Sequence, residues 1–227
     1  MFTLPLLYAA RHMFIETPEG RWLVDTGAPG TFGSSGSITW RGTRRAVPNR
    51  FGPVDLGQVQ SHISIPIAGL IGADLLNEDD SCWDGPAREF RIGKASIPDS
   101  VERLPFESLL GTPVVTAHIG DRTVRCIFDT GAQFGYLLDA DLCPGAAPDG
   151  TIDDFNPILG SIKSDAWQVT FQFGSTQFAE RCGLLTGMAA MALKMFGVDA
   201  IVGCSWLMNR AVWYQPSVGQ LGIGPRA

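Results

Sequence analysis

Hydrophobic and polar residues alternate in short segments along this chain, and glycine, proline or aspartate separates one segment from the next. This pattern is typical of β-strands joined by tight turns. Residues 14–24 predict a hairpin that turns at residues 18–20, and residues 113–128 predict a second hairpin that turns at residues 120–121. Further strands are expected at residues 1–10, 38–40 and 169–173.

Helical periodicity is confined to three short segments: residues 72–76, 188–196 and 203–208. The second segment carries three methionines at helical spacing, and we expect this face to pack into the core. These methionines are Met188, Met191 and Met195. The pattern as a whole predicts a mostly β protein with short helices.

The motif Asp-Thr-Gly-Ala occurs twice in the sequence. Asp25-Thr26-Gly27-Ala28 recurs as Asp129-Thr130-Gly131-Ala132, and an apolar run precedes each copy. Two aliphatic residues and a glycine follow each copy, as Leu70-Ile71-Gly72 in the first half and Ile201-Val202-Gly203 in the second. A lone Asp-Thr-Gly is a common strand ending, because Asp and Gly favour turns. Two copies in equivalent settings indicate an internal duplication instead.

The two halves are collinear apart from one insertion. Asp129 follows Asp25 by 104 residues, whereas Gly203 follows Gly72 by 131 residues, so the second half holds 27 more residues between motif and glycine. We therefore expect two lobes and a short connection: an N-terminal lobe over residues 1–97, a connection over 98–112 and a C-terminal lobe over 113–227.

The composition limits the classes of function. The chain has 227 residues, of which 45% are hydrophobic and 18% are charged, and its formal net charge is -6. This composition suits a soluble globular protein and gives no basic footprint for nucleic acid. No apolar run reaches the roughly 20 residues that span a bilayer. Arg11 and His12 interrupt the apolar start, which makes it a poor signal peptide.

The five cysteines are odd in number and irregularly spaced, which favours free thiols in a reducing compartment over a disulfide framework. We therefore expect a cytoplasmic location. The cysteines and the three histidines lack metal-ligand spacing, and the histidines are far apart. The sequence therefore predicts neither a zinc site nor a Ser-His-Asp site, and it requires no cofactor.

A catalytic site with two carboxyl groups requires two aspartates close together, and the two copies of the motif provide one aspartate each. At close range two carboxyls do not both ionise, so the pKa of one rises while that of the other falls. One group can then take a proton from a water molecule while the other gives a proton to a carbonyl oxygen. Asp25 and Asp129 are therefore the candidate catalytic residues.

The next two residues of each motif are expected to support the loops. Gly27 and Gly131 permit a tight turn, so that their N–H groups can donate to the carboxyls. Thr26 and Thr130 can hydrogen-bond to the opposite loop and tie the two loops together. The aliphatic-aliphatic-glycine motifs are expected to pack beneath the loops, where glycine gives clearance.

With these motifs the chain resembles the pepsin and retropepsin superfamily of aspartic peptidases. The resemblance rests on Val24-Asp25-Thr26-Gly27-Ala28 with residues 70–76, and on Phe128-Asp129-Thr130-Gly131-Ala132 with residues 201–207. Alanine after Asp-Thr-Gly is the retropepsin form. The resemblance implies a bilobal fold of two retropepsin-like halves in one monomeric chain. It further implies an endopeptidase that holds an extended peptide or unfolded protein between the lobes and cuts it with the two aspartates.

In this family the segment between the catalytic loop and the aliphatic-aliphatic-glycine motif carries the flap, a hairpin that closes over the substrate. The first half has 47 residues there and the second has 74, so we expect a single flap within residues 150–167. Its tip is expected at Phe155, Asn156, Pro157, Ile158, Leu159 and Gly160. None of the three tyrosines falls in this segment, so the tyrosine of pepsin flaps has no counterpart there.

Ala28 and Ala132 bear on the pH optimum. Pepsins usually carry Ser or Thr at this position, where a hydroxyl can donate to the carboxylate, and alanine cannot. We therefore expect the pair to lose its proton at higher pH than in pepsins, with an optimum at roughly pH 4–6. Four aromatic residues near the motifs are candidates for apolar subsites or for core packing: Phe32, Trp40, Phe134 and Tyr136.

Two other interpretations remain open. The same fold could serve as a peptide-binding module without turnover, because a fold does not fix a function. Alternatively, two chains could associate so that each pair of aspartates forms between molecules.

Overall fold

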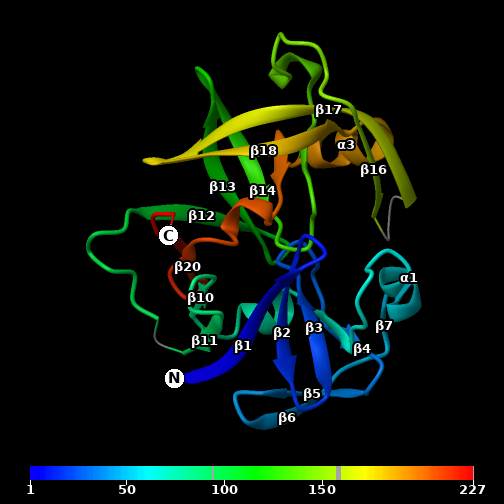
Figure 1. Cartoon of the computed structure of the whole chain (residues 1–227), viewed down its shortest axis with the longest axis vertical. Coiled ribbons are helices and arrows are strands. Elements are labelled where there is room, and N and C mark those ends of the chain that lie inside the picture. The colour runs from blue at the N-terminus through cyan, green and yellow to red at the C-terminus, as the bar shows by residue number, and fades with distance from the viewer. Residues whose placement is uncertain (94, 157–159, 227) are drawn as a thin grey trace.

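The computed structural model describes residues 1–93, 95–156 and 160–226, and its regular structure is mostly β with short helices (Figure 1). The strands of the first half are β1 (Phe2–Ala9), β2 (His12–Thr17), β3 (Gly20–Val24), β4 (Phe32–Gly33), β5 (Ser37–Trp40), β6 (Thr43–Ala46), β7 (Arg50–Phe51), β8 (Val54–Asp55), β9 (Gly69–Ile71), β10 (Ser81–Asp84) and β11 (Glu89–Ile92). The helices of the first half are α1 (Leu56–Gln60) and α2 (Ala73–Leu76).

The strands of the second half are β12 (Arg103–Leu109), β13 (Thr112–Ile119), β14 (Arg122–Phe128), β15 (Gly135–Leu137), β16 (Thr151–Asn156), β17 (Gly160–Phe173), β18 (Thr176–Leu184), β19 (Ala200–Val202), β20 (Ala211–Gln215) and β21 (Gln220–Ile223). Its helix is α3 (Gly187–Met195), and two 3-10 turns lie at Ala140–Leu142 and Ser205–Leu207. The predicted hairpins β2–β3 and β13–β14 are confirmed. No helix of the described residues is long and apolar enough to cross a membrane.

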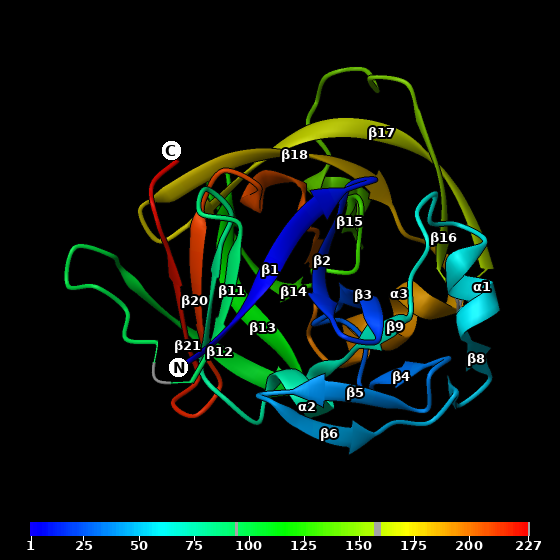
Figure 2. The same ribbon diagram turned by 60° about the horizontal axis from the view of Figure 1, so that its bottom comes forward.

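One antiparallel sheet takes strands from both halves of the sequence, in the order β1-β11-β10-β20-β21-β12. Figure 2 shows these strands gathered on one side of the molecule, close to both termini. The two central strands come from different halves, and Ser81 pairs with Tyr214 while Asp84 pairs with Ala211. The sheet has the same strand order when it is followed inwards from either edge. Each half contributes its first strand, β1 or β12, at the edge and its last two strands in the interior.

In each half, the strand that leads to an aspartate lies between an antiparallel and a parallel partner. β3 pairs with β2 and, in parallel, with β9, which places Val24 opposite Ile71. β14 pairs with β13 and, in parallel, with β19, which places Phe128 opposite Val202. Both aliphatic-aliphatic-glycine motifs therefore lie beside the strands that end at Asp25 and Asp129, as the sequence predicts.

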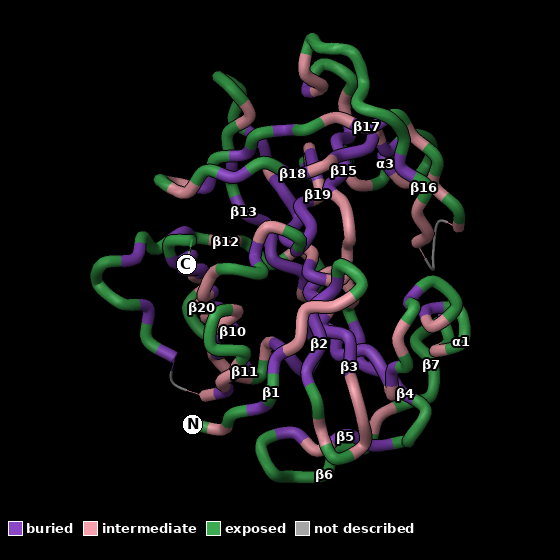
Figure 3. The backbone as a smooth tube through the Cα atoms, in the orientation of Figure 1, coloured by how far each residue is buried: buried purple, intermediate pink, exposed green. Residues whose placement is uncertain are grey.

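The core is continuous across the two halves (Figure 3). Trp83 on β10 is fully buried and stacks on Phe90 of β11, on Phe128 of β14 and, in a tilted arrangement, on Tyr214 of β20. Aromatic pairs of this kind stabilise a fold by about 0.5–1.5 kcal/mol each beyond the burial of their surface. The rings therefore fix the sheet against the strand that ends at Asp129.

Residues 98–112 form more than the connection that the sequence predicts, because they contain β12. Its first part pairs with β21 and its second part with β13, just as β1 pairs first with β11 and then with β2. Only Leu104 of this strand is buried, so the alternation of apolar and polar residues is weak. Pro105 lies on an edge strand, where the missing N–H is tolerated.

The prediction that the α3 methionines pack into the core is wrong. Met188, Met191 and Met195 are 88%, 66% and 86% exposed, and Ala190 is the buried residue of this helix. Helical spacing shows that residues share a face, but it does not show which face the rest of the protein covers. The predicted helix at residues 203–208 is also reduced to a 3-10 turn.

Candidate active site

Asp25 and Asp129 lie on equivalent loops that begin where β3 and β14 end. The N–H of Asp25 donates to the carbonyl of Ile71 (3.0 Å), and the N–H of Asp129 donates to the carbonyl of Val202 (2.9 Å). These bonds continue the two parallel strand pairs by one residue. The position of each aspartate is therefore set by a buried strand and its neighbour.

Backbone N–H groups hold each carboxyl in place. Oδ1 of Asp25 accepts from the N–H of Gly27 and of Ala28, both at 2.9 Å. Oδ1 of Asp129 accepts from Gly131 at 2.9 Å and from the N–H of Ala132 at 3.2 Å. The support expected of these loop residues is therefore present in the structure, and the alanine side chains add no hydroxyl donor.

The two threonines cross-link the loops in a reciprocal pattern. The N–H of Thr26 donates to Oγ1 of Thr130, and the N–H of Thr130 donates to Oγ1 of Thr26, each at 3.0 Å. The hydroxyl of Thr26 donates to the carbonyl of Phe128 at 2.6 Å, and that of Thr130 donates to the carbonyl of Val24 at 2.8 Å. Both threonines are buried, so the four bonds are shielded from water. They fix the separation of the two aspartates.

The two carboxyl groups face each other and share a hydrogen bond. A Cβ added at Gly27 would collide with the carboxyl of Asp129, and one added at Gly131 would collide with that of Asp25. Burial and the charge of Asp129 raise the pKa of Asp25 well above its usual value. Burial also raises the pKa of Asp129, while backbone N–H donors oppose this rise. Both pKa values are therefore raised, and the expected fall of one of them does not occur, because burial acts on both carboxyls. The pair therefore retains one shared proton at a pH where isolated aspartates are ionised.

The glycines beneath the loops have different partners in the two halves. A Cβ at Gly72 would collide with backbone atoms of residues 28 and 30, and one at Gly203 would collide with the carbonyl of Ala132. The N–H of Gly72 donates to Oγ1 of Thr31 at 3.0 Å, whereas the N–H of Gly203 donates to Oε1 of Glu180 at 3.0 Å. The expectation that glycine leaves room for the loops above it is confirmed. The two halves differ, however, in the side chain that accepts the hydrogen bond from this glycine.

Glu180 is a buried carboxyl that the sequence prediction missed. It is 2% exposed, and its Oε2 has no hydrogen-bond partner. Burial raises the pKa of Glu180 to about 8, and the charge of Asp129 adds to this rise. The signal in the sequence is the alternation along β18, where Phe178, Glu180 and Cys182 share the inward face.

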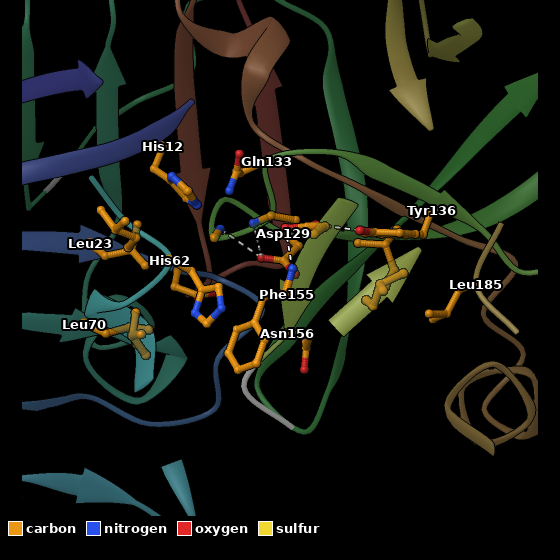
Figure 4. Close-up of a pocket in the computed structure, with 18 residues that line it drawn as sticks. His12, Leu23, His62, Leu70, Asp129, Gln133, Tyr136, Phe155, Asn156 and Leu185 are labelled. Atoms are coloured by element: carbon orange, nitrogen blue, oxygen red, sulfur yellow. Dashed lines mark hydrogen bonds between the residues drawn. The ribbon is translucent and has the colours of Figure 1, made fainter. Parts of the chain in front are cut away.

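Asp25 and Asp129 open onto a pocket of about 110 Å³ (Figure 4). The wall from the first half consists of His12, Leu23, Val59, His62, Ile63 and Leu70. The wall from the body of the second half consists of Gly131, Ala132, Gln133, Tyr136, Leu185 and Ile201. Asp154, Phe155 and Asn156 of β16 and Ile162 of β17 complete the lining. Figure 4 shows the leucines of the first half and Tyr136 on opposite sides of Asp129.

The hairpin expected within residues 150–167 is present as β16 and β17. The strands pair from Thr151↔Asp165 to Asn156↔Gly160. Pro157, Ile158 and Leu159 of the expected tip lie outside the described residues, and Gly160 has a positive φ of 79°. Figure 1 shows this hairpin extending from the second half towards α1 of the first half.

Two contacts hold the hairpin over the pocket. The ring of Phe155 stacks on the ring of His62, just after α1, with centroids 3.6 Å apart and an interplanar angle of 3°. The hydroxyl of Tyr136 donates to Oδ2 of Asp154 at 2.5 Å. The first contact bridges the two halves, and the second fastens the hairpin to the strand that follows the second Asp-Thr-Gly motif.

The four aromatic residues that the sequence offers as subsite candidates separate into two groups. Phe32 and Trp40 are buried in the core, and Phe134 is partly buried with the guanidinium of Arg11 5.2 Å from its ring. Tyr136 alone of the four lines the pocket. Of the four aromatic residues chosen for being near a motif in sequence, one therefore lines the pocket. Side chains along a strand point alternately to its two faces, so nearness in sequence does not show which of them face the pocket.

The described residues hold no cluster of three or more His, Cys, Asp or Glu side chains that is suited to a metal ion. All five cysteines are free thiols. No protein-family model matches this chain, and no curated protein matches it.

Proposed function

We propose that this protein is a bilobal aspartic endopeptidase of the pepsin and retropepsin type. The observation that carries the proposal is the facing pair of carboxyls on two equivalent Asp-Thr-Gly-Ala loops. They share a hydrogen bond, and reciprocal threonine bonds fix their separation. The antiparallel sheet shared by the two halves and the parallel strand beside each loop support a duplicated fold.

In this proposal the pair hydrolyses a peptide bond without a covalent intermediate. The ionised aspartate takes a proton from a water molecule, which attacks the peptide carbonyl carbon. The protonated aspartate gives its proton to the carbonyl oxygen, so a neutral tetrahedral diol forms. The first aspartate then returns its proton to the leaving nitrogen, the C–N bond breaks, and the diol returns its proton to the second aspartate.

The pocket geometry suits an extended peptide that passes between the two halves. Apolar side chains from both halves line the pocket, and the paired strands β16 and β17 contribute Asp154, Phe155, Asn156 and Ile162 to the lining. We assign this hairpin the role of a single flap, with Phe155 and Asn156 facing the substrate. In the first half, α1 and the residues after it occupy the opposite side, where Val59, His62 and Ile63 line the pocket.

The enzyme is proposed to act as a monomer in the cytoplasm. Both aspartates come from one chain and are tied together by bonds within that chain. The five free thiols suit a reducing compartment. Its substrate is a peptide or an unfolded protein.

Cleavage of a diverse peptide library between pH 3 and 8 tests the proposal. We expect cleavage with a maximum at about pH 4–6, since Ala28 and Ala132 provide no hydroxyl to stabilise the ionised pair. Asp129→Asn removes the group that exchanges protons and should lower the cleavage rate at least about 10³-fold. Asp121→Asn makes the same change at an exposed turn and should retain the wild-type rate.

A wild-type protein that cleaves no peptide in this range would refute the enzymatic proposal. Peptide affinity without cleavage would identify the protein as a peptide-binding module with the same fold. An optimum near pH 2 would contradict the role assigned to the two alanines.

A further inference from the structure

The two sides of the pocket differ in chemistry. On the first-half side, four buried aliphatic residues form one apolar surface: Leu23, Val59, Ile63 and Leu70. On the second-half side, Ile162 and Leu185 are apolar, but the carboxylate of Asp154 lies among them. Asp154 pairs directly with Ile162 across β16 and β17, so the two residues are neighbours on one face of the hairpin.

The carboxylate of Asp154 is held in a fixed orientation. Its Oδ2 accepts from the hydroxyl of Tyr136 at 2.5 Å, and its Oδ1 accepts from the N–H of Phe155 at 2.8 Å. A carboxylate has about four lone-pair positions, so each oxygen keeps the capacity to accept a further bond. Asp154 is only partly buried, and it is one of the residues that line the pocket.

The charges around the pocket favour a cation. Asp25, Asp129 and Asp154 line it, and none of the described lining residues is lysine or arginine. Burial lowers the pKa of His12, which opposes a positive charge there, and its Nδ1 bonds to the carbonyl of Ala10 at 2.7 Å. The neighbouring Arg11 places its guanidinium over Phe134. The basic side chains of the described lining are therefore the two histidines: the charge of Asp154 acts to raise the pKa of His12, but burial has the larger effect and lowers it. The other, His62, stacks its ring on Phe155.

We propose that Asp154 is a specificity-determining residue that selects a lysine or arginine side chain at one of the two positions flanking the cleaved bond. The alkyl stem packs against Ile162 and Leu185, and the cationic end donates to the Asp154 carboxylate. Long basic side chains have this division between an apolar stem and a charged end. The assignment rests on the proposed endopeptidase function and names its substrate class.

Two peptides that differ at one flanking position, lysine in one and norleucine in the other, test this selection. Norleucine keeps the stem and lacks the charge. We expect kcat/KM to be at least about tenfold higher for the lysine peptide, since hydrogen bonds between charged groups are stronger than those between neutral groups. In Asp154→Asn this ratio should fall to about one. Tyr136→Phe, which releases one carboxylate oxygen, should lower the ratio by a smaller factor.

Asp153→Asn is the matched control. Asp153 is the preceding residue on β16, its side chain is 72% exposed, and it pairs with Lys163 at 3.4 Å on the other face of the hairpin. This variant should keep the wild-type ratio. A wild-type ratio near one, or an equal loss of selectivity in Asp153→Asn, would overturn the inference.

Binding separates this inference from the proposed function. The lysine and norleucine peptides each carry a fluorescent label. The Asp129→Asn protein and the Asp129→Asn/Asp154→Asn double variant are titrated into each labelled peptide, and fluorescence anisotropy gives the affinities. Tighter binding of the lysine peptide that depends on Asp154 supports the assignment even if the wild type cleaves neither peptide. Equal affinities would refute it even if the wild type proves to be an endopeptidase.

Discussion

The N–H groups of Gly72 and Gly203 occupy equivalent positions but bond to side chains of different chemistry. In the first half, the hydroxyl of Thr31 accepts this bond and itself donates to Oδ1 of Asp74 at 2.6 Å. In the second half, the carboxyl of Glu180 takes that place in a fully buried setting. Because burial raises the pKa of Glu180 to about 8, this carboxyl links stability to pH, whereas the hydroxyl of Thr31 carries no such charge.

The pH dependence of stability should reveal Glu180. Its pKa is about 8 in the folded protein and 4.5 in its ordinary state. Unfolding between these values releases a proton, so the contribution is fully present below about pH 4.5 and is lost as the pH rises through about 8. Glu180→Gln should therefore flatten the decrease in unfolding free energy from pH 5 to 8 by a few kcal/mol, because one pKa unit corresponds to about 1.4 kcal/mol.

Urea unfolding at several pH values measures this change. Asp25 and Asp129 also make the unfolding free energy decrease as the pH rises. Both are present in the wild type and in Glu180→Gln, so their contribution cancels when the two proteins are compared. Glu107→Gln alters a glutamate whose side chain is 75% exposed and should give the wild-type slope. Parallel curves for wild type and Glu180→Gln would show that Glu180 is ionised in the folded protein.

At the scale of elements, β16 and β17 form the part of the structure whose contacts reach across the pocket. The hairpin packs on the first half through the stacked rings of Phe155 and His62. Neither ring belongs to the described hydrophobic clusters, so the contact is separate from the core. We therefore expect substitutions here to affect substrate binding more than folding.

Phe155→Ala should lower kcat/KM for a cleaved peptide about tenfold while the melting temperature stays close to that of the wild type. The alanine removes both the ring that lines the pocket and its contact with His62, which weakens closure over the substrate. Steady-state kinetics and thermal unfolding provide the two measurements. His118→Ala, at an exposed position of β13, is the control for loss of an aromatic ring. If Phe155→Ala kept the wild-type kcat/KM, the proposal that β16 and β17 form a flap would be refuted.

At the scale of the whole molecule, the two halves are joined in ways that leave the aspartate pair within one chain. Backbone bonds between β10 and β20 cross the boundary, and so do the threonine bonds beneath the pair. In the antiparallel sheet that the two halves share, β1 and β12 are the two edge strands and occupy equivalent positions. An arrangement of this kind needs no second molecule to complete the site.

A mixture of Asp25→Asn and Asp129→Asn proteins should remain inactive. Each variant lacks one member of its own pair, and the threonine bonds hold the two loops of one chain together. Both variants are mixed at equal concentration, incubated, and assayed with a peptide that the wild type cleaves. Recovery of about a quarter of the wild-type activity would indicate exchange between chains and a pair formed across a dimer.

The sequence by itself determined the mostly β character, the hairpins β2–β3 and β13–β14, and the duplication. These follow from alternation, turn residues and a repeated motif, which are local signals. It also identified Asp25 and Asp129 as the pair to consider, because one motif occurs twice in equivalent settings.

Only the tertiary structure decided which side chains meet across the chain. The pairing of β12 with β21, the burial of Glu180, the exposure of the α3 methionines and the contact between Phe155 and His62 all depend on distant segments. Local patterns carry no information about the partner that covers a face or about the charge that lies opposite it. The physical reason is that burial and electrostatic environment are properties of the packed chain, whereas turns and strand alternation are properties of neighbouring residues.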